Sequence, residues 1–386
     1  MIAFGRESDR PEHELRTDYS NSPFKTYVDC TLWYMKGYKK LDLLGFSNGD
    51  RISLRTEAPA AGKSMAVIGG RARDEARNST KENLKVLPSW VPTWTFMNGK
   101  RQILNSLSKM SDVGISKRNH VYRACGRHHH VTCHFENGSK RLVVHLSVPV
   151  VRVSTIDPIQ GLEKLVDRKQ RKRETNLGLD KIWETIDKES QCPLTGRDMK
   201  SVLDRTTRAD VHVWFNKEGV MKFSRIDESN LDDEEAARSH PLLGRSGYRP
   251  AVDPSGDLAV YWMSTGRTLF LTESTPDGSP GLIGLGPWNA KAGDEVWLLQ
   301  GFRVLAILRP LQITEDCTYG SMDLETGDAK DKFLPAGETV YEYVGEAFIL
   351  GLMDGEIIDM LGSPPKRPRP PTLVQMDKDF RKIGLV

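Results

Sequence analysis

The densest group of possible metal ligands in this chain lies between positions 125 and 134. Cys125, His128, Cys133 and His134 are the candidates, and zinc prefers thiolate and imidazole ligands in tetrahedral sites. No second pair of ligands lies nearby in the sequence to close a four-ligand site, and neighbouring residues of a strand point to opposite faces. The sequence therefore favours an exposed hairpin between two strands over a metal site, and we expect no cofactor.

Three carboxylates near the C-terminus have types that could do acid–base chemistry. Glu346, Asp354 and Glu356 lie close together in the sequence, and paired carboxylates act as acid and base when their surroundings separate their pKa values. Structural ion pairs are the commoner reason for an inward-facing charge. Because no nucleophile or histidine lies near them, we expect Glu346 to bond to backbone or to pair with Arg267 or Arg309. A hydrolase or nucleotide-cleaving enzyme that uses these carboxylates is the alternative function.

A glycine-rich stretch resembles a phosphate-binding loop in composition. It contains Gly284, Gly286 and Pro287, but a dinucleotide fingerprint needs its glycines between a strand and a helix. Here Pro287 ends the run, and Gly293 with Asp294 leads into another apolar stretch. Tight β-turns, whose positive φ glycine tolerates, explain these glycines better than a phosphate site.

Composition limits the function classes. The 386 residues carry a net charge of +3 and are 38% hydrophobic, which is enough to bury a core and too little positive charge to indicate nucleic-acid binding. The five cysteines are odd in number and scattered, as is typical of reduced thiols in a cytoplasmic protein. No apolar run is long enough for a membrane span. A short basic run, Lys366–Arg369, matches a nuclear-localisation element.

The N-terminal part is expected to be helical. Apolar residues at helical spacing predict a helix at 22–41, and residues 48–83 lack periodicity and are expected to form a mobile insert. Trp90 and Trp94 lie in the proline-containing stretch LPSWVPTW. We interpret this stretch as a packing staple, because buried tryptophans serve cores more often than ligands.

The rest of the chain predicts a β-rich module. Stretches rich in β-branched residues predict strands over 120–156 and 266–356. Helical periodicity indicates an insertion at about 157–257, in which Thr195 is the expected cap of one helix. The fold class is therefore α+β: a small antiparallel β-barrel or sandwich with a helical insertion and an N-terminal helix.

Several of these residues belong to short motifs that occur in a fixed order. The motifs are Arg267-Thr268-Leu269-Phe270, Gly284-Leu285-Gly286-Pro287, Gly293-Asp294, Arg309-Pro310, and Val344-Gly345-Glu346-Ala347-Phe348 followed by Gly351-Leu352-Met353-Asp354-Gly355-Glu356. This series resembles the C-terminal signature of fungal heterokaryon-incompatibility (HET) proteins. The stretch around Trp90 and Trp94 resembles a further motif of that family, with Thr93 where an aspartate is usual. Cys125 lies in a separate stretch that resembles another motif of the family, at a position where a serine is usual.

The resemblance implies a role in self/non-self recognition that leads to programmed cell death. It implies a protein partner and no catalysis by this part, whereas a small-molecule ligand is left open. The N-terminal HET domain is expected upstream and is not found, so we expect a truncated protein. The expected division is a segment 1–95 with the helix, insert and staple, a β-module 115–362, and a basic proline-rich tail 363–386.

Overall fold

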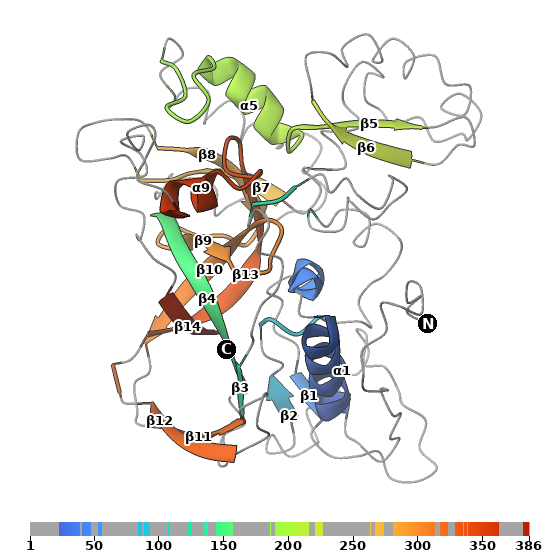
Figure 1. Cartoon of the computed structure of the whole chain (residues 1–386), viewed down its shortest axis with the longest axis vertical. Helices are drawn as coiled ribbons and strands as arrows, with labels where there is room; N and C mark the ends of the chain where they lie inside the picture. The colour runs from blue at the N-terminus through green and yellow to red at the C-terminus, as the bar shows by residue number, and fades with distance from the viewer. Residues whose placement is uncertain are drawn as a thin grey trace, which may run out of the picture.

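The computed structural model describes somewhat less than half of the chain. The described residues are 23–38, 41–47, 53–55, 84–86, 89–92, 107, 122–124, 134–137, 144–156, 186, 190–215, 221–226, 263, 267–273, 281–312, 317–322, 329–334, 336–337, 339–362 and 381–385. They form a mixed α+β structure in which one large, mainly antiparallel sheet is accompanied by two small two-stranded sheets and a few short helices (Figure 1).

The large sheet combines strands from the middle and the end of the chain. Its strands are β3 (His134–Asn137), β4 (Val144–Thr155), β7 (Arg267–Leu271), β8 (Ile283–Pro287), β9 (Glu295–Leu299), β10 (Leu305–Gln312), β11 (Cys317–Met322), β12 (Ala329–Leu334), β13 (Thr339–Ile349) and β14 (Arg381–Leu385). The main order is β12-β11-β3-β4-β9-β10-β13-β8-β7. Five of these neighbours, β9-β10-β13-β8-β7, form an antiparallel sheet that contains most of the family-like motifs.

The sheet is not closed into a barrel, which was one of the two arrangements, barrel or sandwich, that the sequence predicted. Strand β14 pairs antiparallel with β4 along its whole length. It meets β13 at a single parallel pair, Tyr341↔Leu385. One residue pair does not make a continuous ladder, so the barrel alternative is wrong. Strand β14 also lies within 363–386, where the sequence analysis expected only a basic tail.

The core is centred on β9, β10 and β13. In β13 every residue from Val340 to Ile349 is buried. Successive side chains of a strand point to opposite faces, so both faces of β13 are covered. Trp297 of β9 is fully buried and meets Tyr341 edge to face, with ring centroids 5.3 Å apart. Aromatic pairs of this kind add to the stabilisation from burial alone.

The N-terminal helix predicted at 22–41 is present as α1 (Pro23–Tyr38). Its inward face carries Val28, Thr31 and Met35, which are all buried. Their spacing of three and four residues places them on one side of the helix. Thr31 donates its hydroxyl hydrogen to the carbonyl of Tyr27 at 2.8 Å, so its polar group is satisfied within the helix.

A 3-10 helix, η2 (Asp42–Phe46), connects this N-terminal part to the sheet. Asp42 is buried and pairs with Arg303, with Nη2 and Oδ2 3.3 Å apart. The hydroxyl of Ser47 donates to the carbonyl of Trp90 at 3.1 Å. Trp90 is fully buried, so it contributes to the core as the packing interpretation expects.

A two-stranded sheet lies beside α1. It pairs β1 (Ser53–Arg55) with β2 (Leu84–Val86) in antiparallel register, and α1 contacts β1. Strand β1 falls within 48–83, which the sequence analysis expected to be a mobile insert. These three residues differ from that expectation because a distant partner supplies the backbone hydrogen bonds that the local sequence does not reveal.

The predicted helix in the insertion is confirmed as α5 (Met199–Thr207), with a different cap. The carboxylate of Asp198 accepts a hydrogen bond from the backbone N–H of Ser201 at 2.8 Å. Asp198 is therefore the N-cap and Thr195 is not. The reason is geometric, because a cap must accept from the second or third residue of the helix, and Thr195 lies one turn too early.

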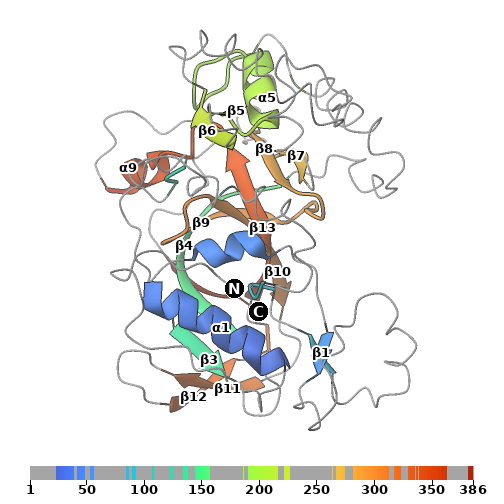
Figure 2. The same ribbon diagram turned by 90° about the vertical axis from the view of Figure 1, so that its right-hand side faces the viewer.

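The described part of the insertion also contains a β-hairpin, which was not predicted. Strands β5 (Val211–Phe215) and β6 (Met221–Arg225) pair antiparallel directly after α5. The hairpin and α5 lie together at one end of the molecule (Figure 1), and β13 points toward this end (Figure 2). A turn after β13 leads into a short helix, α9 (Glu356–Gly362). Among the described residues no helix is long and apolar enough to cross a membrane.

Candidate functional site

The carboxylate of Glu346 is held by an arginine and by backbone. Glu346 lies on β13 and Arg267 begins β7, and both side chains are less than a tenth exposed. The Nη2 atom of Arg267 lies 3.5 Å from Oε2 of Glu346. The same oxygen accepts a hydrogen bond from the N–H of Leu107 at 2.6 Å, and Nη1 of Arg267 donates to the carbonyl of Met263 at 3.0 Å. These are the two kinds of partner that the sequence analysis expected.

The surroundings of this ion pair have a low dielectric. Burial lowers the pKa of Arg267, although the carboxylate of Glu346 opposes the change. Burial also disfavours the charged form of Tyr343, which raises the pKa of this residue, and the nearby carboxylate of Glu346 raises it further. In such surroundings a charge that loses its partner is strongly destabilising. The pair therefore fixes the position of β7 relative to β13.

A second ion pair holds the turn between β8 and β9. Nε and Nη2 of Arg309 donate to the two carboxylate oxygens of Asp294 at 2.8 and 2.9 Å, which is the strong bidentate arrangement. Nη2 of Arg309 also donates to the carbonyl of Asn289, and Asp294 accepts from the N–H of Lys291. The hydrogen bond to Asp294 is the main reason that the pKa of Arg309 is raised. Gly293, at φ +81°, supplies the positive φ of this turn.

The turn that Arg309 holds presents an aromatic side chain to solvent. Trp288 is 49% exposed and is the exposed large hydrophobic residue of the described part of the chain. The N–H of Ala290 donates to the carbonyl of Pro287 at 3.0 Å, which closes the turn on either side of Trp288. Pro287 was assigned to a motif of the chain, but Trp288, which follows it, was not singled out from the sequence.

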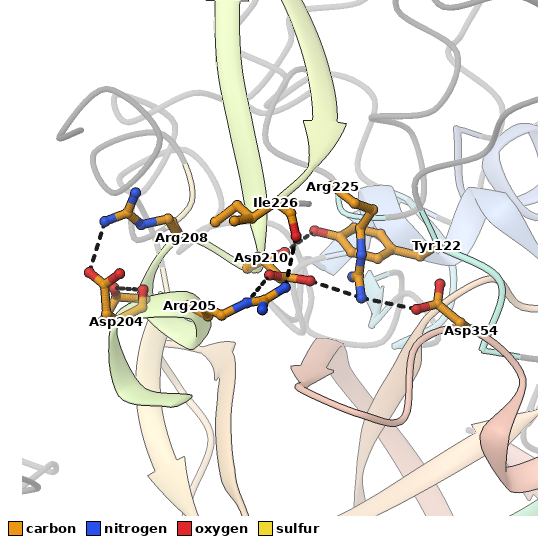
Figure 3. A network of polar contacts seen from close by, with 10 residues as sticks. Tyr122, Asp204, Arg205, Arg208, Asp210, Arg225, Ile226 and Asp354 are labelled. Atoms are coloured by element: carbon orange, nitrogen blue, oxygen red, sulfur yellow. Dashed lines mark hydrogen bonds and ion pairs between the residues drawn. The ribbon is translucent and has the colours of Figure 1, made fainter. Parts of the chain in front are cut away.

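A third group of charges joins the insertion to the turn after β13 (Figure 3). The Nη2 atom of Arg225 lies 3.0 Å from both Oδ2 of Asp210 and Oδ2 of Asp354. Nε of Arg205 donates to the other oxygen of Asp210 at 2.5 Å. Asp210 is almost fully buried, and its pKa is raised because burial outweighs the two arginines. Arg225 was not predicted, since its partners are far away in the sequence.

Aromatic rings complete this group. The guanidinium of Arg225 lies over the ring of Tyr122 at 5.3 Å and near the ring of Phe348 at 5.9 Å, measured to the centroids. Such cation–π contacts stabilise an arginine that is partly removed from water. The hydroxyl of Tyr122 donates to the carbonyl of Ala209 at 2.5 Å. Tyr122 therefore contacts both the cation and the backbone beside Asp210.

The structure gives the three C-terminal carboxylates different partners. Asp354 pairs with Arg225, and its N–H donates to Oε2 of Glu356 at 2.7 Å. Burial is the main cause that raises the pKa of Glu356. Gly351 and Gly355 shape this turn at φ +89° and +100°. Asp354 and Glu356 are thus brought together, whereas Glu346 on β13 is paired with Arg267.

Two glycines that the sequence analysis assigned to turns lie inside strand β8. A Cβ atom at Gly284 would stand 2.1 Å from Cζ of Phe270, and one at Gly286 would also meet that ring. These positions are glycine because a ring of β7 lies directly on the backbone of β8, so the turn interpretation is wrong for them. Gly345 has a similar reason, since its Cβ would stand 2.9 Å from Cγ of Pro287.

Most of the metal candidates fall outside the described residues. Cys125, His128 and Cys133 do so, as do Trp94 and the basic run Lys366–Arg369, and His134 lies in β3. Within the described ranges no three His, Cys, Asp or Glu residues are grouped so that they could hold a metal ion.

Comparisons with known proteins do not assign the chain to a family. No family model matches it, and no curated protein and no solved structure shows significant similarity to it. The resemblance to HET proteins rests on the motifs themselves, and what it implies stays a prediction.

Proposed function

We propose that this chain is a non-enzymatic recognition module of the HET type that binds a protein partner in the cytoplasm. The observation that carries the proposal is how two charged residues of its motifs, Glu346 and Asp294, are bonded. Glu346 and Asp294 are almost fully buried, and each is bonded to an arginine and to a backbone N–H. A general acid or base must reach a proton of its substrate, whereas these carboxylates hold strands and a turn in place.

The surface offers a contact residue of the kind that a recognition module needs. Trp288 is exposed on a turn that the Arg309–Asp294 pair fixes. Tryptophans are enriched among the residues that dominate protein–protein binding energies. A side chain on a preorganised turn also loses less conformational freedom on binding. Trp288 is therefore the residue through which we expect the partner to be bound.

Cross-linking in living fungal cells tests this proposal. Tagged wild-type chain and the Trp288→Ala variant would be expressed in a fungus that undergoes cell fusion and cross-linked before lysis. We expect a protein cross-linked to the wild type and lost from the variant. Equal melting temperatures would show that both chains are folded. Identical cross-linking patterns, or no cross-linked protein in fusing cells, would contradict the proposal.

The alternative is a hydrolase or nucleotide-cleaving enzyme, and one observation favours it. Glu356 has a raised pKa and contacts the backbone of Asp354, and an acid–base catalyst needs a carboxyl group whose pKa is raised in this direction. An incubation with a panel of nucleotides and esters, followed by chromatography, would test it. Product that disappears in Glu356→Gln and persists in Trp288→Ala would establish the enzyme and reject the recognition module.

A further inference from the structure

The junction between α5 and β5 has an unusual backbone. Ala209 and Asp210 both adopt positive φ, at +49° and +54°, and neither is a glycine. A residue with a Cβ atom is disfavoured in this region, although aspartate tolerates it better than alanine. Residues in such conformations persist only where the surrounding structure holds them. Two in succession identify the junction as a strained point of the chain.

Contacts from three sides hold the junction in this conformation. Within the insertion, the N–H of Asp210 donates to the carbonyl of Arg205 at 2.6 Å, and Nε of Arg205 bonds the Asp210 carboxylate. From outside the insertion, the hydroxyl of Tyr122 bonds the carbonyl of Ala209. From β6, which belongs to the same insertion, Arg225 bonds the second oxygen of Asp210. The junction is therefore determined by residues on both the hairpin and the β-module.

One contact in this group differs from the others because solvent reaches it. Asp354 is 52% exposed, whereas Asp210 is 1% exposed, and the same Nη2 atom of Arg225 serves both. The Nη1 atom of Arg225 is buried and has no hydrogen-bond partner in the described part of the structure. The group contains Arg205, Arg225, Asp210 and Asp354 (Figure 3). A carboxylate oxygen of Glu356 accepts a hydrogen bond from the N–H of Asp354. Arg225 is thus secured on its outer side by one exposed carboxylate.

We propose that the α5–β5 junction is a strained hinge and that the Arg225–Asp354 ion pair is the latch that keeps the β5–β6 hairpin on the turn after β13. When Asp354 releases Arg225, β6 loses its outer link to the β-module. The strain at Ala209 and Asp210 then favours opening, because it is relieved when the junction relaxes. Salt weakens an exposed ion pair far more than a buried one. The latch is therefore sensitive to ionic strength, whereas the Asp210 contacts are not. This inference does not depend on the proposed recognition function.

Hydrogen exchange of the full chain tests the latch. In Asp354→Asn we expect the amides of β5 and β6 to exchange about two- to fivefold faster at low salt, the range for a partly exposed ion pair, while β9, β10 and β13 are unchanged. Added salt should accelerate the hairpin in the wild type and have no effect in this variant. Asp204→Asn is the matched control: Asp204 is 57% exposed and pairs at 2.8 Å with Arg208 of its own helical segment, so its loss should leave the hairpin unchanged.

A second variant tests the hinge from the buried side. Tyr122→Phe keeps the ring under Arg225 and removes the hydrogen bond to the carbonyl of Ala209. We expect hairpin exchange about two- to tenfold faster, as for a lost internal hydrogen bond, with the salt dependence retained because Asp354 is intact. Hairpin exchange that is unchanged in both variants would overturn the proposal. Exchange that rises equally across the whole sheet would overturn it as well, because the contacts would then stabilise only the entire fold.

Discussion

Glu346 carries a charge whose value to the fold can be measured by removing it. In Glu346→Gln the buried guanidinium of Arg267 loses its counter-charge, so we expect the free energy of unfolding to fall by about 3 kcal/mol. Urea denaturation checks this. Asp204→Asn, which removes an exposed partner, should change the stability by no more than about 0.5 kcal/mol. Small and equal changes in the free energy of unfolding of the two variants would contradict the structural role of Glu346.

Gly284 provides a steric test at the residue scale. Its Cβ would stand 2.1 Å from Cζ of Phe270, so we expect Gly284→Ala to lower the stability by about 1–3 kcal/mol through overpacking. Adding Phe270→Leu should recover part of this loss, because the smaller side chain leaves room for the new methyl group. Thermal unfolding of both variants decides the matter. A Gly284→Ala protein that is as stable as the wild type would restore the interpretation that Gly284 lies in a turn.

Glu356 makes a residue-scale prediction about pH. Burial raises its folded-state pKa above the ordinary 4.5, so the folded state binds the proton more tightly than the unfolded state does. The stability contributed by this group is therefore present below 4.5 and is lost as the pH rises through the folded-state pKa. Glu356→Gln does not ionise. We expect its stability relative to the wild type to increase between about pH 4 and about pH 7, measured by urea unfolding at both values.

At the scale of elements, the start of α5 distinguishes two caps. Asp198→Ala should lower the stability by about 1 kcal/mol, because the N–H of Ser201 loses its acceptor. Thr195→Ala should have a smaller effect, since the Thr195 hydroxyl makes only a long contact of 3.4 Å with the N–H of Arg197. Chemical unfolding of the two variants in parallel checks the order. The reverse order would return the cap to Thr195.

The segment around α5 shows which structural features the local sequence can predict and which it cannot. The helical face of Met199, Val202 and Leu203 could be predicted because periodicity records burial directly. The β5–β6 hairpin that follows was not predicted, because the whole insertion at about 157–257 was expected to be helical. Strand β14 was missed for another reason: its partner β4 lies far away in the sequence, and no local signal marks such pairing.

At the scale of the whole molecule, the sequence indicated an antiparallel β-rich module with an N-terminal helix, and the structure has both. It could not decide between a closed barrel and an open arrangement, because closure depends on whether β14 forms a full ladder with β13. The candidate site likewise contains residues that the sequence could predict and residues that it could not. The sequence offered Arg267, Arg309 or backbone as partners of Glu346, and the structure shows Arg267 and backbone. Arg225 could not be found in this way, because β6 and the turn after β13 meet only in the folded structure.

The most direct test of the recognition function is cell death after fusion of fungal strains. One strain would carry the wild-type chain, Trp288→Ala or Glu356→Gln, and its fusion partner would lack the chain. The fraction of dead fusion cells would be counted by uptake of a vital dye. We predict that death requires Trp288 and persists in Glu356→Gln. Death that persists without Trp288 and is lost in Glu356→Gln would contradict the account and favour catalysis.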